Sequence, residues 1–196
     1  FVSGTSIEYF PSYICTGQDN QHLATGYKIG QRFHSAEAIR VADGRTRHLG
    51  HLVKADGRWR IFVFAGDQAP TDPASAAYRF VDFLANDPTS PVRKYTPSGA
   101  DIDAVIDTYA VFQQSDLAMP DLHDYLWPAK GKYGLRDYEK AFYAAPNNDI
   151  YDLRGIDRQA GCVVIVRPDQ HVANIMPMDA HAECPAFFDA FMIAQT

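Results

Sequence analysis

Three cysteines, Cys15, Cys162 and Cys184, are the residues of this chain with the greatest potential for nucleophilic or redox chemistry. Thiol–disulfide exchange needs a thiolate of low pKa and commonly a second cysteine close by, as in a Cys-x-x-Cys pair. The sequence has no such pair, and three widely spaced cysteines predict neither a disulfide framework nor a tetrahedral zinc site. Cys162 opens an apolar run, so we expect a buried, unreactive thiol there.

Four histidines stand where a metal site is conceivable. His48 and His51 form a His-x-x-His pair. On a strand, residues three apart point to opposite faces, so we expect solvent-facing side chains beside a turn rather than shared metal ligands. His171 and His181 lack an acidic pair at ligand spacing, and we expect them at the surface or in an interface.

Serine nucleophiles have no sequence support. No Gly-x-Ser-x-Gly motif occurs, and Ser3, Ser12 and Ser98 lie in turn-like contexts. A catalytic triad assembled from distant residues stays open, because its members need not be near in sequence.

The segment IFVFAGDQAP, residues 61–70, places Gly-Asp after an apolar run, as flavoproteins do where they hold the FAD ribityl chain. No Gly-x-Gly-x-x-Gly follows an early strand, and Thr71-Asp72-Pro73 stands where a glycine-rich helix start belongs. We therefore expect Asp67 in a plain loop and Asp72 at a helix cap. From these motifs we assign no catalytic, cofactor-binding or metal-ligating residue to the chain.

Composition and charge exclude several classes of partner. With 196 residues, 46% of them hydrophobic, the chain predicts one globular domain with its own core. A net charge of -6 leaves no basic field for nucleic acid, and no run of about 18 apolar residues predicts a membrane span. The mixed charges of KGKYGLRDYEK, residues 130–140, predict a solvated surface. The cysteine usage fits the reducing cytoplasm.

The first third of the chain predicts a linker and then a sheet. Residues 1–32 are turn-rich and patchily apolar, which indicates an extended linker rather than core. Two turns, Asp43-Gly44 and Asp56-Gly57, lie between strand-like runs and predict a meander over residues 36–66. Residues 60–65 end in the apolar run IFVFA, which is typical of a strand at the centre of a sheet.

The rest of the chain alternates helix and strand. Asp72-Pro73 predicts a helix start, and the helix ends near residue 86 with apolar residues at i, i+3, i+4 and i+7, namely Ala77, Phe80, Val81 and Leu84. Residues 102–114 favour a strand. Residues 115–160 indicate an irregular excursion with short helical turns. We then expect a hairpin of residues 162–166 and 172–176 and a closing helix that begins at Glu183 or Cys184, because of Pro185.

Three segments carry a family resemblance: residues 42–66 (ADGRTRHLGHLVKADGRWRIFVFAG), 131–143 (GKYGLRDYEKAFY) and 151–180 (YDLRGIDRQAGCVVIVRPDQHVANIMPMDA). They resemble the C-terminal domain of the phenol hydroxylase and 3-hydroxybenzoate hydroxylase group of FAD-dependent aromatic monooxygenases. The resemblance covers most of residues 1–192. In it, the turn Arg167-Pro168-Asp169-Gln170 marks the final hairpin, while Cys184-Pro185 departs from the smooth helix expected there.

The resemblance implies an α/β fold, a thioredoxin-like three-layer sandwich with a central mixed sheet. Residues 33–196 would form this domain, and residues 1–32 would be the linker from the end of a missing flavin domain. In a thioredoxin the reactive cysteine follows the first central strand, but residues 65–75, AGDQAPTDPAS, contain none. The resemblance further implies a homodimer and contact with the FAD-binding catalytic domain.

An aromatic-rich stretch adds a candidate surface. Core packing and an interface both fit its composition, and the resemblance favours an interface; its aromatic residues are Tyr125, Trp127, Tyr133, Tyr138, Phe142 and Tyr143, beside Arg136 and Arg154.

Our first hypothesis is an assembly domain of a flavin-dependent aromatic hydroxylase that acts in aromatic catabolism. By resemblance, the parent enzyme would use FAD, NAD(P)H and dioxygen to hydroxylate a phenol or hydroxybenzoate. The alternatives are an autonomous redox protein of the same fold and a free-standing module that binds small aromatics. The sequence identifies neither the aromatic substrate nor the residues of a dimer interface.

Overall fold

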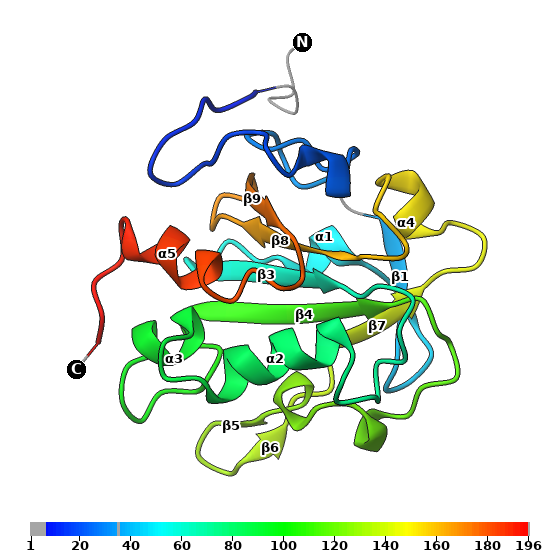
Figure 1. The fold of residues 1–196 in the computed structure, drawn as a ribbon. Coiled ribbons are helices and arrows are strands. Elements are labelled where there is room, and N and C mark those ends of the chain that lie inside the picture. The colour runs from blue at the N-terminus through cyan, green and yellow to red at the C-terminus, as the bar shows by residue number, and fades with distance from the viewer. Residues whose placement is uncertain (1–6, 35, 196) are drawn as a thin grey trace.

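The computed structural model describes residues 7–34 and 36–195 (Figure 1). Within them, seven strands form one mixed sheet in the order β2-β1-β7-β4-β3-β8-β9. These strands are β1 (Glu37–Arg40), β2 (Thr46–His48), β3 (Trp59–Phe64), β4 (Ile106–Phe112), β7 (Ala141–Ala144), β8 (Cys162–Val166) and β9 (Val172–Met176). A separate hairpin joins β5 (Ala129–Lys130) to β6 (Leu135–Arg136). The helices are α1 (Leu49–Leu52), α2 (Ala76–Asn86), α3 (Pro91–Tyr95), α4 (Ile150–Leu153) and α5 (Glu183–Asp189), with 3-10 turns η1 (Gln21–Leu23), η2 (Met119–Asp121) and η3 (Asp124–Leu126).

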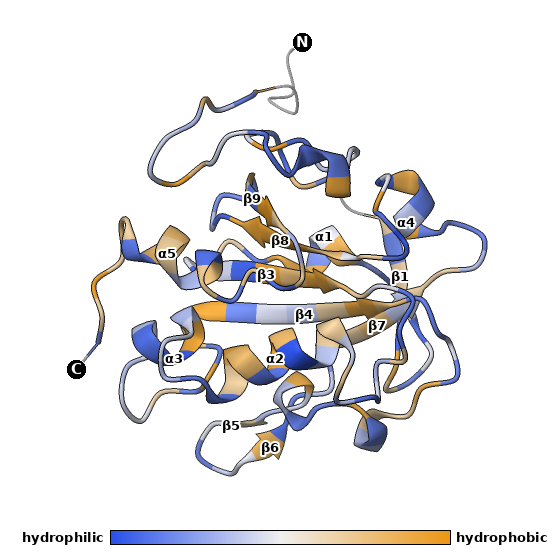
Figure 2. Cartoon of the chain, viewed as in Figure 1, coloured by the Kyte–Doolittle hydropathy of each residue, from blue (hydrophilic) through white to orange (hydrophobic). Residues whose placement is uncertain are grey.

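Strand β3 lies at the centre of the sheet, as its apolar run predicts. It pairs in parallel with β4 and antiparallel with β8, and all its residues are buried. Its side chains alternate between two core clusters, one on each face, with Ile61 and Val63 in one and Phe62 and Phe64 in the other. Figure 2 shows the hydrophobic colour concentrated on β8, β9 and part of β3.

Helices α2, α3 and α5 cover one face of the sheet. The expected apolar side of α2 is confirmed, because Ala77, Phe80, Val81 and Leu84 are all buried. The expected cap is wrong: the hydroxyl of Ser75 accepts the Tyr78 N–H, whereas the Asp72 carboxylate accepts the Ala74 N–H in the preceding turn.

The opposite face is covered by α1, α4 and the N-terminal segment 7–34. We expected this segment to lie outside the core, and for Leu23, Tyr27 and Ile29 that prediction is wrong, since all three are buried in the second cluster. The ring of Tyr27 stacks on Phe33 with centroids 4.7 Å apart. Few regular elements are present there, but enough apolar side chains to form the third layer.

The first Asp-Gly turn behaves as predicted and the second does not. Asp43-Gly44 joins β1 to β2, and Gly44 takes a φ of +67° that favours glycine. After β2 the chain enters α1, and Asp56-Gly57 lies just before β3. This second turn therefore joins no two strands as a hairpin, and the predicted meander is wrong. A strand apolar on both faces needs neighbours on both sides in the core, and the half-exposed β2 cannot serve as one.

The later elements follow the expected order with one omission. Strand β4, the β8–β9 hairpin and α5 are confirmed, and α5 begins at Glu183. The excursion 115–160 contains a strand that we did not predict: β7 lies between β1 and β4 in the main sheet. The four adjacent strands β4-β3-β8-β9, with a parallel pair, an antiparallel hairpin and a final helix, form the thioredoxin-like α/β arrangement expected from the order of elements.

Candidate interaction site

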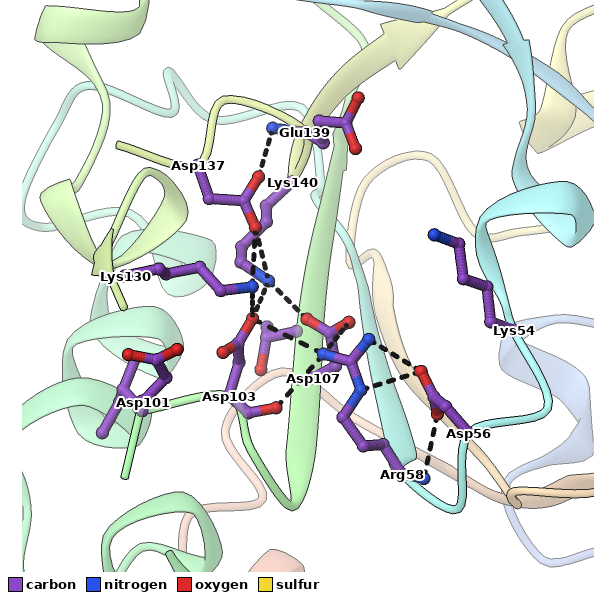
Figure 3. Close-up of polar contacts among 12 residues, drawn as sticks. Lys54, Asp56, Arg58, Asp101, Asp103, Asp107, Lys130, Asp137, Glu139 and Lys140 are labelled. Carbon is purple, nitrogen blue, oxygen red and sulfur yellow. Dashed lines mark hydrogen bonds and ion pairs between the residues drawn. The ribbon is translucent and has the colours of Figure 1, made fainter. Parts of the chain in front are cut away.

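A buried cluster of charged side chains lies beside the first half of β4 (Figure 3). The ammonium of Lys140 is 2.7 Å from the carboxylate of Asp103 and 2.5 Å from that of Asp107. All three residues are at most 3% exposed. Figure 2 shows the matching hydrophilic stretch near the start of β4, between hydrophobic ends.

Two arginines extend the cluster towards β3. Arg58 lies 3.1 Å from the Asp107 carboxylate and 2.8 Å from that of Asp56. The fully buried Arg60 contacts the same Asp56 carboxylate at 2.8 Å. Buried charges are tolerated when they are paired and hydrogen-bonded, and the network pairs each of these side chains, although the Arg60 Nε has no hydrogen-bond partner.

Two carboxylates of the network, Asp103 and Asp137, are held in their charged form. Burial favours a higher pKa for Asp103, but the charge of Lys140 and hydrogen bonds from Lys130 and Lys140 outweigh it and lower the pKa of that carboxyl. The same balance, with Lys140 again the leading cation, lowers the pKa of Asp137. For Lys130, burial is outweighed by Asp103 and Asp137, and its pKa is raised.

The network anchors the β5–β6 hairpin to the sheet. Lys130 in β5 reaches Asp103 at 2.7 Å and Asp137 at 3.2 Å. The N–H of Gly131, at the start of the hairpin turn, donates to the Asp101 carboxylate. The small hairpin, which has little core of its own, is thereby tied by charge-assisted hydrogen bonds to the segment that leads into β4.

The outer side of this hairpin is unusually apolar. Tyr133 is 80% exposed, Leu135 71% and Tyr138 43%. Tyr138 stacks on Trp127, and the guanidinium of Arg136 lies 4.8 Å from the centre of the Trp127 ring. An open groove of about 930 Å³ runs alongside, lined by residues 40–43, 117–120, 130 and 135–139.

The aromatic-rich stretch divides between core and surface. Phe142 is fully buried, and the hydroxyl of the buried Tyr125 is 2.9 Å from that of Thr108. Tyr133 and Tyr138 are exposed on the hairpin and Trp127 is half-buried between them and the core. Core packing is therefore confirmed for Phe142 and Tyr125, and the interface role stays a prediction for the exposed residues.

The three cysteines are free and buried. Burial raises the pKa of Cys162 and of Cys184 well above the usual range of a thiol. Burial also raises the pKa of Cys15, with the charges of Asp169 and Glu8 acting in the same direction and that of Arg167 opposing them. Such thiols are poorly suited to exchange chemistry, which needs an accessible thiolate.

The histidine rings take part in stacking contacts. His48 ends β2 and His51 lies in α1, so the two rings stack at 4.9 Å, and the prediction that they point to opposite faces is wrong. His181 stacks on Phe83. Among residues 7–34 and 36–195, no three His, Cys, Asp or Glu side chains are grouped to hold a metal ion. In the same residues no helix is long and apolar enough to cross a membrane.

The remaining candidates lie in turns or loops. Asp67 is in the loop after β3, and Ser98 is in an exposed turn. Ser12 forms an isolated bridge with Cys15. Ser3 lies outside the described residues.

The turn Arg167–Gln170 holds the N-terminal segment. The guanidinium of Arg167 lies 4.4 Å from the centre of the Tyr9 ring, and His171 meets the same ring edge-on at 4.9 Å. The Gln170 side-chain amide donates to the Val53 carbonyl at 2.7 Å. The turn therefore closes the β8–β9 hairpin and also contacts the N-terminal segment and the loop at Val53.

Sequence reasoning missed the charged cluster because it read residues 130–140 as solvated. Lys140 is instead 3% exposed, and Lys130 is partly buried. One signal was available: Asp107 interrupts an otherwise apolar strand, and an acid there needs a buried cation as partner.

A family model matches residues 7–196, and its description is the phenol hydroxylase C-terminal dimerisation domain. The chain belongs to this family. The match extends over both the N-terminal layer and the β5–β6 hairpin, so both are parts of the family's domain rather than additions to it.

Curated relatives agree. A 3-hydroxybenzoate 4-monooxygenase of Comamonas testosteroni is 45% identical over 99% of this chain, and the FAD-dependent monooxygenase terD of Aspergillus terreus is 33% identical over 98%. The chain spans only 31% and 32% of the length of these proteins.

Two solved structures with lower similarity are a thioredoxin, Etrx1, of Streptococcus pneumoniae and the peroxidoxin BcpB of Mycobacterium tuberculosis. They are 14% and 12% identical to this chain, with TM-scores of 0.40 and 0.44. The alignments cover 78% and 83% of this chain and 98% and 97% of theirs. Scores at this level support no argument about function.

Proposed function

We propose that this chain is the assembly domain of a flavin-dependent aromatic hydroxylase and pairs two copies of that enzyme. The observation that carries the proposal is the family match over residues 7–196, together with relatives of which the chain spans about a third. The buried, high-pKa thiols weigh against the alternative of an autonomous redox protein.

The parent enzyme in this proposal carries the chemistry on another domain. FAD would bind there, NAD(P)H would supply two electrons, and dioxygen would give one oxygen atom to a phenol or hydroxybenzoate while the other leaves as water. The relatives' names support FAD dependence and an aromatic substrate. The contribution of this chain is to hold the catalytic domain and a second subunit, in a cytoplasm that keeps its three thiols reduced.

The test is the intact denatured mass of the protein purified from its source, measured beside its visible absorption spectrum. The proposal expects a polypeptide much heavier than 21.9 kDa that shows oxidised-flavin bands. A colourless polypeptide of 21.9 kDa would contradict it, because the domain would then exist without a flavin domain on the same chain.

A further inference from the structure

The hairpin patch, which consists of Tyr133, Leu135 and Tyr138 beside the groove of about 930 Å³, has no role in the core of this chain. None of the three residues belongs to either described core cluster, yet each has a large apolar side chain exposed to water. We propose that the hairpin patch is the surface through which two copies of this chain pair about a twofold axis. This inference rests on the proposed function, since it names the surface that the assembly uses.

The hairpin patch presents two tyrosines and a leucine to solvent. Exposed tyrosine, together with an apolar neighbour, is the composition from which strong binding contacts are made. Arg136, whose guanidinium stacks on Trp127, adds a residue type that is enriched at such contacts. A solvated loop has no need of this combination.

The base of the hairpin is held in place by ion pairs. The partly buried Lys130 forms them with the buried Asp103 and with Asp137. Buried ion pairs contribute little to stability compared with apolar packing, so their presence favours a role in positioning. A surface already fixed in place loses less conformational entropy when a partner binds.

The groove beside the hairpin patch has no net formal charge. It is lined by three basic residues (Arg40, Lys130 and Arg136) and three acidic ones (Asp43, Asp137 and Glu139). The whole chain carries -6, and two copies therefore repel each other over most orientations. A twofold contact brings a surface against itself, and a groove of balanced charge beside the hairpin patch is suited to that.

The two edge strands of the main sheet are β9 and β2. Residues 16 and 30–33 cover β9, where the Gly30 N–H donates to Val172 and the Thr16 N–H to Ala173. A second copy cannot add a strand at this edge without displacing them. The opposite edge strand, β2, has three residues and offers a short ladder.

The experiment measures the dimer dissociation constant of the 196-residue chain by sedimentation equilibrium from about 0.1 to about 100 µM. The double variant Tyr133→Glu/Leu135→Glu introduces charge into the patch and is expected to raise this constant at least about a hundredfold. Tyr133→Ala/Leu135→Ala is expected to raise it about tenfold. The matched control is Phe10→Glu/Tyr13→Glu on the exposed N-terminal segment, expected to leave the constant unchanged. Far-ultraviolet circular dichroism and the urea midpoint verify that each variant folds.

The outcomes separate this inference from the proposed function. A wild-type chain that stays monomeric throughout overturns both. A wild-type dimer that folded hairpin variants leave intact overturns the inference alone, and the patch would then be available to the catalytic domain of the parent. Dissociation of the Phe10 and Tyr13 variant alone would place the contact on the N-terminal segment and also overturn it.

Discussion

At the scale of single residues, burial decides what each reactive group can do. The thiols of Cys162 and Cys184 are enclosed by apolar side chains, which keeps them protonated at neutral pH. The carboxyl of Asp103 is equally buried, but the charge of Lys140 and hydrogen bonds from Lys130 and Lys140 lower its pKa. Asp107 pairs with the same Lys140 ammonium. Burial without a charged partner therefore leaves the thiols unreactive, whereas burial beside a lysine gives stable ion pairs.

The thiols give the first prediction. In the folded chain Cys15, Cys162 and Cys184 should react with a thiol reagent at neutral pH at least about a hundredfold more slowly than free cysteine. In denaturant all three should react at the ordinary rate. The measurement is the time course of thiol titration with and without denaturant. One fast thiol in the folded protein would restore the redox alternative.

The network gives the second prediction. Asp103→Asn removes a carboxylate shared by the buried Lys140 and the partly buried Lys130, and it should lower the free energy of unfolding by about 3 kcal/mol at neutral pH. The control is Asp101→Asn, where the amide oxygen can still accept the Gly131 N–H, and about 0.5 kcal/mol or less is expected. Urea unfolding measures both. Equal losses in the two variants would contradict the account.

The same network predicts a pH dependence. Since the pKa of Asp103 and of Asp137 is lower in the folded chain, their stabilisation is complete above the unfolded carboxyl value of about 4. It is lost as the pH falls below that value, through the lower folded pKa. Urea unfolding at a series of pH values should show this acid loss, and the slope should be smaller in Asp103→Asn. An identical slope in the variant would mean that Asp103 is not one of the titrating groups.

At the scale of elements, segments with an unbroken pattern were predictable and segments defined by distant partners were not. The β8–β9 hairpin and the apolar side of α2 follow from alternation and helical spacing. Strand β7 is four residues long and is a strand because β1 and β4 lie on either side of it, which no local pattern reveals. Lys140 could not be placed for the same reason: its partners are more than thirty residues away.

The N-terminal segment gives the prediction at this scale. Tyr27→Ala removes a buried ring that stacks on Phe33, and it should lower the free energy of unfolding by about 3 kcal/mol. Tyr13→Ala is the matched control, because that ring is 81% exposed, and its effect should stay within about 0.5 kcal/mol. Urea unfolding distinguishes the two. Equal, small losses would mean that this segment is a linker after all.

At the scale of the whole molecule, the parts that form the core are separate from the hairpin that presents apolar side chains to solvent. The sheet and its two covering layers supply the core, and the β5–β6 hairpin lies outside the main sheet (Figure 1). It carries large exposed apolar side chains. The family to which the chain belongs is named for dimerisation, and the hairpin patch combines exposed apolar side chains with a base held by ion pairs and a groove of balanced charge. The account therefore depends on two chains pairing.

The most direct test is the molar mass of the wild-type chain in solution, measured by light scattering over a range of concentrations at about 0.15 M salt. The account predicts a mass that rises with concentration to twice the 21.9 kDa of a single chain. A mass that stays at 21.9 kDa up to about 100 µM would contradict its central claim, since a weaker association could not hold two enzyme subunits together.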